Sequence, residues 1–370
     1  MSSNWGRNIR LSVFGESHGP AVGCVLDGLP AGFAPDMDQV RYHMARRSAG
    51  GKPWATARVE ADAVELQSGV LAGKLTGAPL CALIRNNNTR SGDYGAAMTL
   101  PRPSHADYSA HVRYGGHEDF RGGGHFSGRL TAPLVFAGAL AMQLLAQRGV
   151  VIGAHLSRIG SVADRRFDTV ALTEDLLTNL TESAFPTLDD GAATAMIAEI
   201  QRTKEALDSV GGEVELAVLG LPGGVGSPMM DGLESTIASL LFAIPAIKGL
   251  EFGDGFALCA QRGSQANDAY MTQQGQVRTA TNHNGGILGG ISTGMPLILR
   301  AAVKPTPSIA QGQRTVNLAT GTEETLAIRG RHDPCIAPRA LVAIEAAVAL
   351  ALLDCWMDVD PWQQERNVPL

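Results

Sequence analysis

The stretches LTAPLVFAGALAMQLLAQ (residues 130–147) and ALVAIEAAVALALLDCWM (residues 340–357) decide the fold. Each predicts a helix that is apolar nearly all round, interrupted chiefly by Gln143 in the first and Glu345 in the second. Helices of this kind are buried. Neither is long or clean enough to cross a bilayer. We therefore expect both helices to lie between layers of sheet.

Strands surround these helices in an order that occurs twice. Residues 11–14 and 21–26 predict strands, and Asp36 can cap a helix that continues to about residue 47. Later, residues 213–219 predict a strand, and a helix follows Asp231 to about residue 244. Between strand and helix lie the similar turns GLPAG (28–32) and GLPGG (220–224). This pattern indicates an internal duplication, although two short glycine-rich strings can also match by chance.

The predicted elements define an α+β fold. It is a β-α-β sandwich with internal duplication, in which a helical layer lies between antiparallel sheets. A chain of 370 residues is long enough to bury a large core as one domain. We expect a single domain over residues 1–370, with pseudo-repeats at roughly residues 8–210 and 211–358.

Composition excludes several classes of protein. A net charge of −6 with 5% aromatic residues argues against nucleic-acid binding, which uses basic faces and aromatic stacking. The five cysteines are widely spread and form no Cys-x-x-Cys pair, which disfavours disulfides and zinc sites. No apolar run resembles a signal peptide or a membrane span. We expect a soluble, cytoplasmic protein that binds neither nucleic acid nor membrane.

The first candidate for chemistry is the segment GESHGP (residues 15–20), directly after a predicted strand. Gly15 and Gly19 allow close approach of a ligand to the backbone, and His18 titrates near neutral pH. An active-site turn has these features. A hairpin corner with a surface histidine is the alternative.

The run YGGHEDFRGGGHFSGR (residues 114–129) leads directly into the first buried helix. Consecutive glycines expose backbone N–H groups, and a helix N-terminus adds positive potential. An anion such as phosphate would be favoured near Ser127 and Arg129, because arginine adds a bidentate donor pair. A flexible surface loop is the alternative.

Two further loops place ionisable groups beside prolines. In PSHADY (103–108), Asp107 lies two residues after His105 and could orient its imidazole, although a solvated or core histidine would fit the same segment. In GRHDPC (330–335), Asp333 precedes the second buried helix. Asp333 could be held ionised or act as a base, or form a structural ion pair with Arg331 or Arg339.

Irregular segments at residues 86–108, 117–128, 263–290 and 304–321 hold most of the glycine, proline, histidine and arginine. Long loops of this kind are usually functional. Their amides and hydroxyls suit a large phosphate-bearing cofactor. No dinucleotide or P-loop fingerprint and no metal-ligand spacing is present. His43, His111 and His155 lack supporting neighbours, and we expect structural or surface roles for them.

Taken together, GESHG, the residue 114–129 run and GRHDPC resemble the three signature regions of the chorismate synthase family. The resemblance extends in order from about residue 5 to residue 357. It includes Arg46-Arg47, HADY (105–108), GDGF (253–256), RGSQ (262–265) and the loop at residues 304–308.

The resemblance implies a homotetrameric β-α-β sandwich. It implies trans-1,4 elimination of phosphate from 5-enolpyruvylshikimate 3-phosphate to give chorismate, the last common step of the shikimate pathway to aromatic amino acids. Reduced FMN would be required without net redox change, and an external reductant would supply it. A phosphate leaving group needs cationic and amide donors, and the flavin needs a site shielded from water.

The resemblance also implies residue roles. His18 would protonate or stabilise the departing phosphate, His105 would manage the protonation state of the reduced flavin, and Asp333 would assist proton removal. FMN would be held by His125, Phe126, Ser127, Pro245, Ala246, Gly289, Lys304, Pro305, Thr306, Pro307, Ser308 and Arg331. The substrate's phosphate and carboxylates would be bound by Arg46, Arg47, Arg129 and Arg339.

The chain departs from the family pattern in three places. Family members often continue the double arginine as RRRPG with another basic residue beyond, whereas this chain has RRSAGGKP (46–53). Ser104 replaces a common glycine, and Pro245 replaces a common asparagine.

Two other functions remain open. The altered loop at residues 48–53 would suit a non-catalytic flavin- or phosphate-binding protein. An FMN oxidoreductase is disfavoured by the missing nicotinamide fingerprint, while a built-in flavin reductase using NADP stays open.

Overall fold

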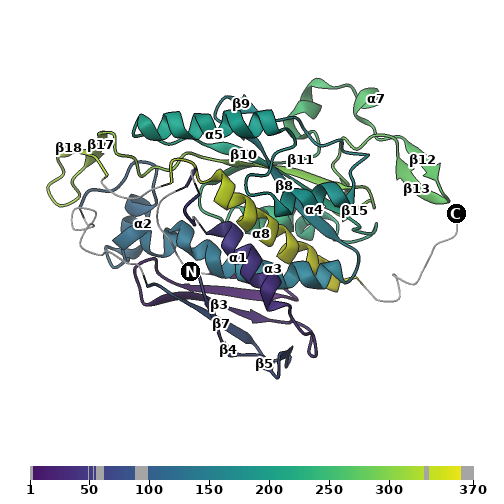
Figure 1. The fold of residues 1–370 in the computed structure, drawn as a ribbon, viewed down its shortest axis with the longest axis horizontal. Helices are drawn as coiled ribbons and strands as arrows, with labels where there is room; N and C mark the ends of the chain where they lie inside the picture. The colour runs from purple at the N-terminus through teal and green to yellow at the C-terminus, as the bar shows by residue number, and fades with distance from the viewer. Residues whose placement is uncertain are drawn as a thin grey trace.

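Two antiparallel sheets enclose a layer of helices, so the predicted α+β sandwich is confirmed (Figure 1). The computed structural model describes residues 3–48, 50–52, 54–55, 62–87, 99–328 and 333–359.

The first sheet has the strand order β1-β2-β3-β7-β4 and lies at the bottom of Figure 1. Its strands are β1 (Asn4–Trp5), β2 (Arg10–Gly15), β3 (Ala21–Asp27), β7 (Leu80–Arg85) and β4 (Val64–Ser68). Val22, Cys24 and Leu26 of β3 are buried in the main core. This alternation turns one face of the strand toward the helices.

The second sheet has the order β11-β16-β10-β8-β9. Its strands are β11 (Ile247–Phe252), β16 (Leu297–Val303), β10 (Gly212–Leu219), β8 (Val151–Ile159) and β9 (Val162–Ala163). Leu216 and Val218 of β10 face the main core, while Ala217 between them belongs to a second cluster with Leu177 and Leu180. This sheet is therefore covered on both faces.

Four helices form the central layer: α1 (Met37–Arg47), α3 (Thr131–Ala146), α6 (Leu233–Leu241) and α8 (Ala337–Met357). Helix α3 contacts β2, β3 and β7 of the first sheet, and α8 contacts β8 and β10 of the second. The two helices also pack on each other. A Cβ on Gly138 would lie 2.3 Å from the Cβ of Ala346, so small residues set this close crossing.

The remaining helices lie outside this layer. They are α2 (Asp107–Tyr114), α4 (Glu174–Glu182), α5 (Asp190–Glu205) and the single turn α7 (Gly263–Ala266). Helices α4 and α5 contact β8. Four two-stranded pairs complete the fold: β5 (Val70–Leu71) with β6 (Lys74–Leu75), β12 (Tyr270–Gln273) with β13 (Gln276–Thr279), β14 (Ile287–Leu288) with β15 (Ile291–Ser292), and β17 (Gln313–Val316) with β18 (Glu323–Leu326).

Within the described chain, two helical segments are long and apolar enough to cross a membrane by length and composition alone, so the prediction that neither helix was long or clean enough was wrong. They are Gly128–Ala146 and Ala337–Met357, and the most apolar stretches are 83% and 94% buried inside the protein. Core helices satisfy the same criterion, and these two occupy the centre of the sandwich.

The predicted helices are confirmed with small changes at their ends. Asp36 caps α1 by accepting from the amides of Asp38 and Gln39. Helix α8 begins at Ala337 rather than residue 340, with proline in its first turn, where no intrahelical N–H partner is needed. Helix α6 ends at Leu241 rather than residue 244. Pro245 explains the difference, because a residue before proline avoids the helical conformation.

Two of the segments predicted to be irregular contain strands. The segment 263–290 includes the β12–β13 hairpin, and the segment 304–321 includes β17, which pairs with β18. All four residues of β12 are exposed. Such a strand has no buried face, so its sequence carries no alternation of apolar and polar residues.

The two GLP turns adopt the same local structure. Gly28 and Gly220 have φ of +91° and +77°, and a Cβ on either would lie 1.9 or 2.0 Å from a backbone carbonyl oxygen. The leucines that follow are buried in both turns. The boundaries 8–210 and 211–358 remain a prediction.

His155 is fully buried on β8 between two carboxylates. Its Nδ1 lies 3.1 Å from Asp164 and its Nε2 lies 2.8 Å from Glu215. Burial alone would lower the pKa of His155, but the hydrogen bonds to Asp164 and Glu215 raise it above 6.5. This contact agrees with the structural role expected for His155.

Candidate active site

The turn between β2 and β3 places Ser17 and His18 in the interior. Gly15 ends β2 with φ +97°, and a Cβ there would lie 2.3 Å from the carbonyl oxygen of Ala21. Only glycine fits this exit. Ser17 and His18 are 2% and 8% exposed, and the Ser17 amide donates to the carbonyl of Gly124 (3.0 Å). The turn is docked on the glycine run, and the alternative of a surface histidine does not hold.

The glycine run brings two distant histidines to neighbouring positions. Gly122 and Gly123 lie in a 3₁₀ segment, Arg121–Phe126, with φ of +59° and +86°. A Cβ on Gly122 would lie 2.2 Å from Nδ1 of His18, and a Cβ on Gly123 would lie 2.9 Å from Cε1 of His105. Both imidazoles therefore pack on the same stretch of bare backbone. A flexible surface loop would not make these contacts.

His105 is paired with Asp107, as the sequence suggested. Nδ1 of His105 lies 2.5 Å from Oδ1 of Asp107. Arg102, which the sequence analysis did not single out, donates from Nε and Nη2 to the two oxygens of Asp107, each over 2.7 Å. Burial alone would raise the pKa of the Asp107 carboxyl, but the hydrogen bonds from Arg102 and His105 hold it far below its usual range.

Asp119, a carboxylate that the sequence analysis did not single out, lies near His18. Arg121 donates to Asp119 from Nε (2.8 Å) and Nη2 (2.9 Å). These hydrogen bonds hold the pKa of the Asp119 carboxyl below its usual range, and the charge of His18 acts in the same direction. Asp119 also lines a cavity beside Gly123, together with Asp107, Glu118, Phe126 and other residues of α2 and the loop.

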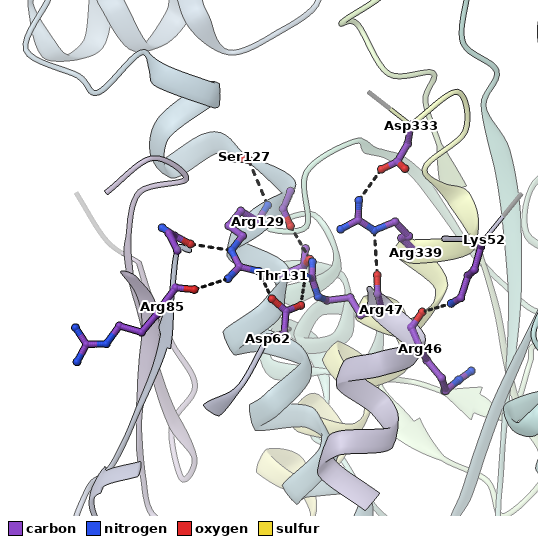
Figure 2. Close-up of polar contacts among 12 residues, drawn as sticks. Arg46, Arg47, Lys52, Asp62, Arg85, Ser127, Arg129, Thr131, Asp333 and Arg339 are labelled. Carbon is purple, nitrogen blue, oxygen red and sulfur yellow. Dashed lines mark hydrogen bonds and ion pairs between the residues drawn. The ribbon is translucent and has the colours of Figure 1, made fainter. Parts of the chain in front are cut away.

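Three of the predicted substrate-binding arginines cluster around two aspartates (Figure 2). Arg47 and Arg129 both pair with Asp62, and the side chains of all three are at most 5% exposed. Burial alone would raise the pKa of the Asp62 carboxyl, but the two arginines hold it below its usual range. Arg339 pairs with Asp333 over 2.6 Å and donates to the carbonyl of Arg47 over 3.0 Å. The ion pair of Asp333 with Arg339 is thus present.

Asn86 connects this cluster to the His18 turn. Its Oδ1 accepts from Nε of Arg129 (3.0 Å), and its Nδ2 donates to the carbonyls of Glu16 and Gly19 (3.0 and 2.9 Å). The cationic cluster and the histidine pair therefore share one framework.

Arg46 lies apart from this cluster. Its guanidinium makes a two-pronged contact with Glu345 of α8, over 2.6 and 3.1 Å, and in Figure 2 it points away from Asp62. The Lys52 ammonium donates to the Arg46 carbonyl (2.9 Å). Burial lowers the pKa of Lys52, and the charges of Arg46 and Arg339 lower it further.

The loop at residues 304–308 contacts the His105 segment. Lys304 Nζ donates to the carbonyl of Ser104 (3.0 Å), and Ser308 Oγ accepts from Arg102 (3.3 Å). Among the described residues, the buried hydroxyl of Thr306 has no hydrogen-bond partner. The backbone amide of Lys304 donates to the carbonyl of Ala246 (2.9 Å), which places Pro245 and Ala246 beside this loop.

The other predicted cofactor residues are placed as follows. His125 bonds the carbonyl of Gly15 and the hydroxyl of Ser3, each over 2.8 Å. Phe126 is 36% exposed, and Ser127 caps the first turn before α3 by accepting from the amide of Arg129. Gly289 joins β14 to β15, which Figure 1 shows on the opposite side of the molecule from α2. Arg331 lies outside the described residues.

The fold and the site define an α+β sandwich in which two histidines lie beside a cluster of arginines. Residues 9–357 match the family model of chorismate synthase. The chain belongs to the chorismate synthase family, so it is a phosphate-eliminating lyase of aromatic amino-acid biosynthesis.

Similar proteins agree over almost the whole chain. A chorismate synthase of Dehalococcoides mccartyi is 45% identical over 96% of this chain and 96% of its own length. One of Thermococcus kodakarensis is 45% identical over 97% of this chain and 98% of its own. A crystal structure of chorismate synthase aligns with a TM-score of 0.75 and 26% identity, covering 96% of this chain and 93% of the other.

The sequence analysis did not identify three residues of this site: Asp62, Arg102 and Asp119. Asp119 lies inside a motif discussed above, and Arg102 lies next to one. A search of these motifs for carboxylate–arginine pairs would have identified both residues. Asp62 belongs to no motif, and its partners are 15 and 67 residues away. No signal in the sequence pointed to it.

Proposed function

We propose that this protein eliminates phosphate from 5-enolpyruvylshikimate 3-phosphate in a trans-1,4 sense to give chorismate, with reduced FMN and without net redox change. One observation carries the proposal. His18 and His105 meet at Gly122 and Gly123, and Asn86 links the His18 turn to the cluster of buried arginines.

The arginine cluster suits an anionic substrate. Arg47, Arg129 and Arg339 carry three positive charges against the two of Asp62 and Asp333. Each guanidinium presents five N–H donors in a planar fork that matches phosphate and carboxylate. We propose that these arginines bind the substrate's phosphate and carboxylates. Arg46 pairs with Glu345, which offsets its charge, and we propose that its guanidinium also binds the substrate.

The two histidines and Asp333 would manage the protons. A 1,4-elimination removes a proton and a leaving group across a four-carbon unit. His18, with Asp119 nearby, would protonate or stabilise the departing phosphate. Asp333 would assist proton removal, with its carboxylate oriented by Arg339. His105 would exchange a proton with the reduced flavin.

The residues near His105 fit a phosphate-bearing cofactor. Lys304 and Ser308 supply a charge and a hydroxyl, and the buried hydroxyl of Thr306 offers an unused hydrogen bond. We propose that FMN is held by this loop with Pro245, Ala246, His125, Phe126, Ser127, Gly289 and Arg331. When bound, reduced FMN supplies an electron-rich ring that assists loss of phosphate.

Gly289 supports a proposal about assembly. The β14–β15 pair that it joins lies on the opposite side of the molecule from α2 (Figure 1), and a Cβ on Gly289 would meet only open space. Gly289 would then reach the flavin from another copy of the chain, in a homotetramer. We also propose a cytoplasmic location and an external source of reduced FMN.

An anaerobic assay tests the proposed reaction. Chorismate absorbance and phosphate release are followed together with 5-enolpyruvylshikimate 3-phosphate and reduced, oxidised or no FMN. Equal release of both products only with reduced FMN supports the proposal. Flavin binding without turnover would instead favour the non-catalytic alternative and point to loop 48–53. Turnover with NADPH and oxidised FMN would indicate a built-in reductase.

Variants test the residue roles. His18→Ala and Asp333→Ala should fold normally, because neither side chain belongs to the apolar core, and should lose at least ~10²-fold in kcat. His117→Ala is the matched control, since His117 is an exposed histidine of the same loop region. Undiminished kcat in a folded His18 or Asp333 variant would refute that residue's role.

A further inference from the structure

We propose that Asp107 and Arg102 are a positioning pair that keeps the proton of neutral His105 on Nδ1, so that proton exchange at the site takes place at Nε2. The inference concerns the state of His105 itself. It rests on the proposed function only for the use made of that proton.

The first step is the contact at Nδ1. Nδ1 of His105 lies 2.5 Å from Oδ1 of Asp107, and an ionised carboxylate can only accept. Nδ1 must therefore carry a hydrogen. Arg102 Nη2 lies farther from Nδ1, at 3.1 Å, and it already donates to the same Oδ1 over 2.7 Å. Arg102 can only donate, and a protonated Nδ1 cannot accept, so Arg102 forms its hydrogen bond with the carboxylate.

The second step is that Asp107 cannot leave this state. Arg102 donates to it three times: from Nε and Nη2 over 2.7 Å each, and from the backbone amide over 3.0 Å. The side chains of both residues are at most 9% exposed. Burial raises the pKa of the Asp107 carboxyl, but the hydrogen bonds from Arg102 and His105 lower it by more. The carboxylate is thus ionised and fixed in orientation throughout the working pH range.

The third step concerns the opposite edge of the imidazole. A Cβ on Gly123 would lie 3.0 Å from Nε2 of His105, so Nε2 faces the glycine run. The adjacent Gly122 packs against His18 in the same way. The nitrogen that can gain or lose a proton is therefore on the side shared with His18. The His105 side chain as a whole is 15% exposed.

Loss of the charge should reverse the tautomer. In Asp107→Asn the single amide oxygen would face the guanidinium of Arg102, which needs an acceptor. The amide nitrogen would then face Nδ1 of His105 and donate to it. The neutral imidazole would carry its proton on Nε2, which is the wrong-tautomer effect known for histidines that lose a carboxylate partner.

Magic-angle-spinning NMR of protein labelled with ¹⁵N-histidine reads the tautomer directly. The His105 signals are assigned by difference with His105→Gln, and the tautomer is read from the spectrum of the neutral ring. We expect a protonated Nδ1 and an unprotonated Nε2 in the wild type, and the reverse in Asp107→Asn. Asp254→Asn is the matched control. It removes the carboxylate 2.7 Å from Nδ1 of His283 and should leave the His105 signals unchanged.

A proton on Nε2 in the wild type, or an unchanged pattern in folded Asp107→Asn, would overturn the inference. If Asp107→Asn does not fold, Arg102→Lys replaces it, because lysine keeps the charge but loses the fork. Mixed tautomers are then expected, and a pure Nδ1–H state would count against the pair. The NMR samples contain neither flavin nor substrate, so failure of the proposed reaction would leave this result intact. In the lyase assay we expect at least a 10-fold lower kcat for Asp107→Asn.

Discussion

Replacing Asp62 with asparagine should cost far more stability than its single charge suggests. The carboxylate is 1% exposed and bridges Arg47 and Arg129, which are 1% and 5% exposed. In Asp62→Asn both guanidiniums stay buried while the charge between them is lost. Arg47 also donates to the hydroxyl of Thr131, and Arg129 donates to the amide oxygen of Asn86; neither of these two partners carries a charge.

The magnitude follows from the burial. Removing one partner of a buried ion pair typically costs ~3–5 kcal/mol, because a charge is left uncompensated in low dielectric. Asp62 serves two cations, so we expect a loss at the upper end of that range. Urea denaturation of both proteins at the same protein concentration measures this loss.

Glu65→Gln is the matched control for Asp62→Asn. Glu65 pairs with Arg85 on the same sheet over 3.2 Å, but the two side chains are 44% and 54% exposed. Exposed pairs contribute ~0–1 kcal/mol. If Asp62→Asn loses no more stability than Glu65→Gln, the buried bridge from Asp62 to the two arginines does not contribute the expected free energy of unfolding.

The same variant has a pH signature. The pKa of Asp62 is lower in the folded protein than its ordinary value of 3.8. Its contribution to stability is therefore present above that value and lost as pH falls through the folded pKa. The gap between wild type and Asp62→Asn should shrink on acidification below about 3.8. A constant gap across that range would contradict this account.

Two further predictions concern buried histidines. Gly122→Ala would place a Cβ 2.2 Å from Nδ1 of His18, and displacing the imidazole should reduce kcat by about 10²-fold. Gly128→Ala is the control, because a Cβ on Gly128 would meet nothing within 4 Å. Equal kcat values for the two variants would refute the packing argument. The pKa of His155 is raised in the folded protein, so its ion pairs stabilise the fold fully below pH 6.5 and less as pH rises through the folded pKa. In thermal denaturation, the stability difference between wild type and His155→Gln should therefore shrink at alkaline pH. A stability difference that does not change with pH would contradict this prediction.

Local rules predicted the helical layer because each helix carries its own evidence. Helices α3 and α8 are apolar all round, and Asp36 marks the start of α1. The hairpins β12–β13 and β17–β18 were missed because they are short and largely exposed. These strands bury no continuous face, so folding does not require apolar and polar residues to alternate in their sequences.

Positions of single functional groups were predicted where they lie inside a motif. The contact between His105 and Asp107 spans two residues, and chain geometry alone brings such groups near each other. Arg102 shares that neighbourhood, yet its pairing depends on how the loop folds back. The separation of the β14–β15 pair from α2 likewise appears only in the folded chain.

The sequence by itself determined the sandwich, the helices at its centre and membership of the chorismate synthase family, because periodicity, capping and motif order are local properties. Only the tertiary structure decided which charges meet. Arg46 pairs with Glu345, whereas Arg47 shares Asp62 with Arg129. Neighbouring arginines on one helix point in different directions, and their partners come from elements far apart in the chain. A buried charge needs an opposite charge close to it in space. The packing of the whole domain determines which residue supplies that charge.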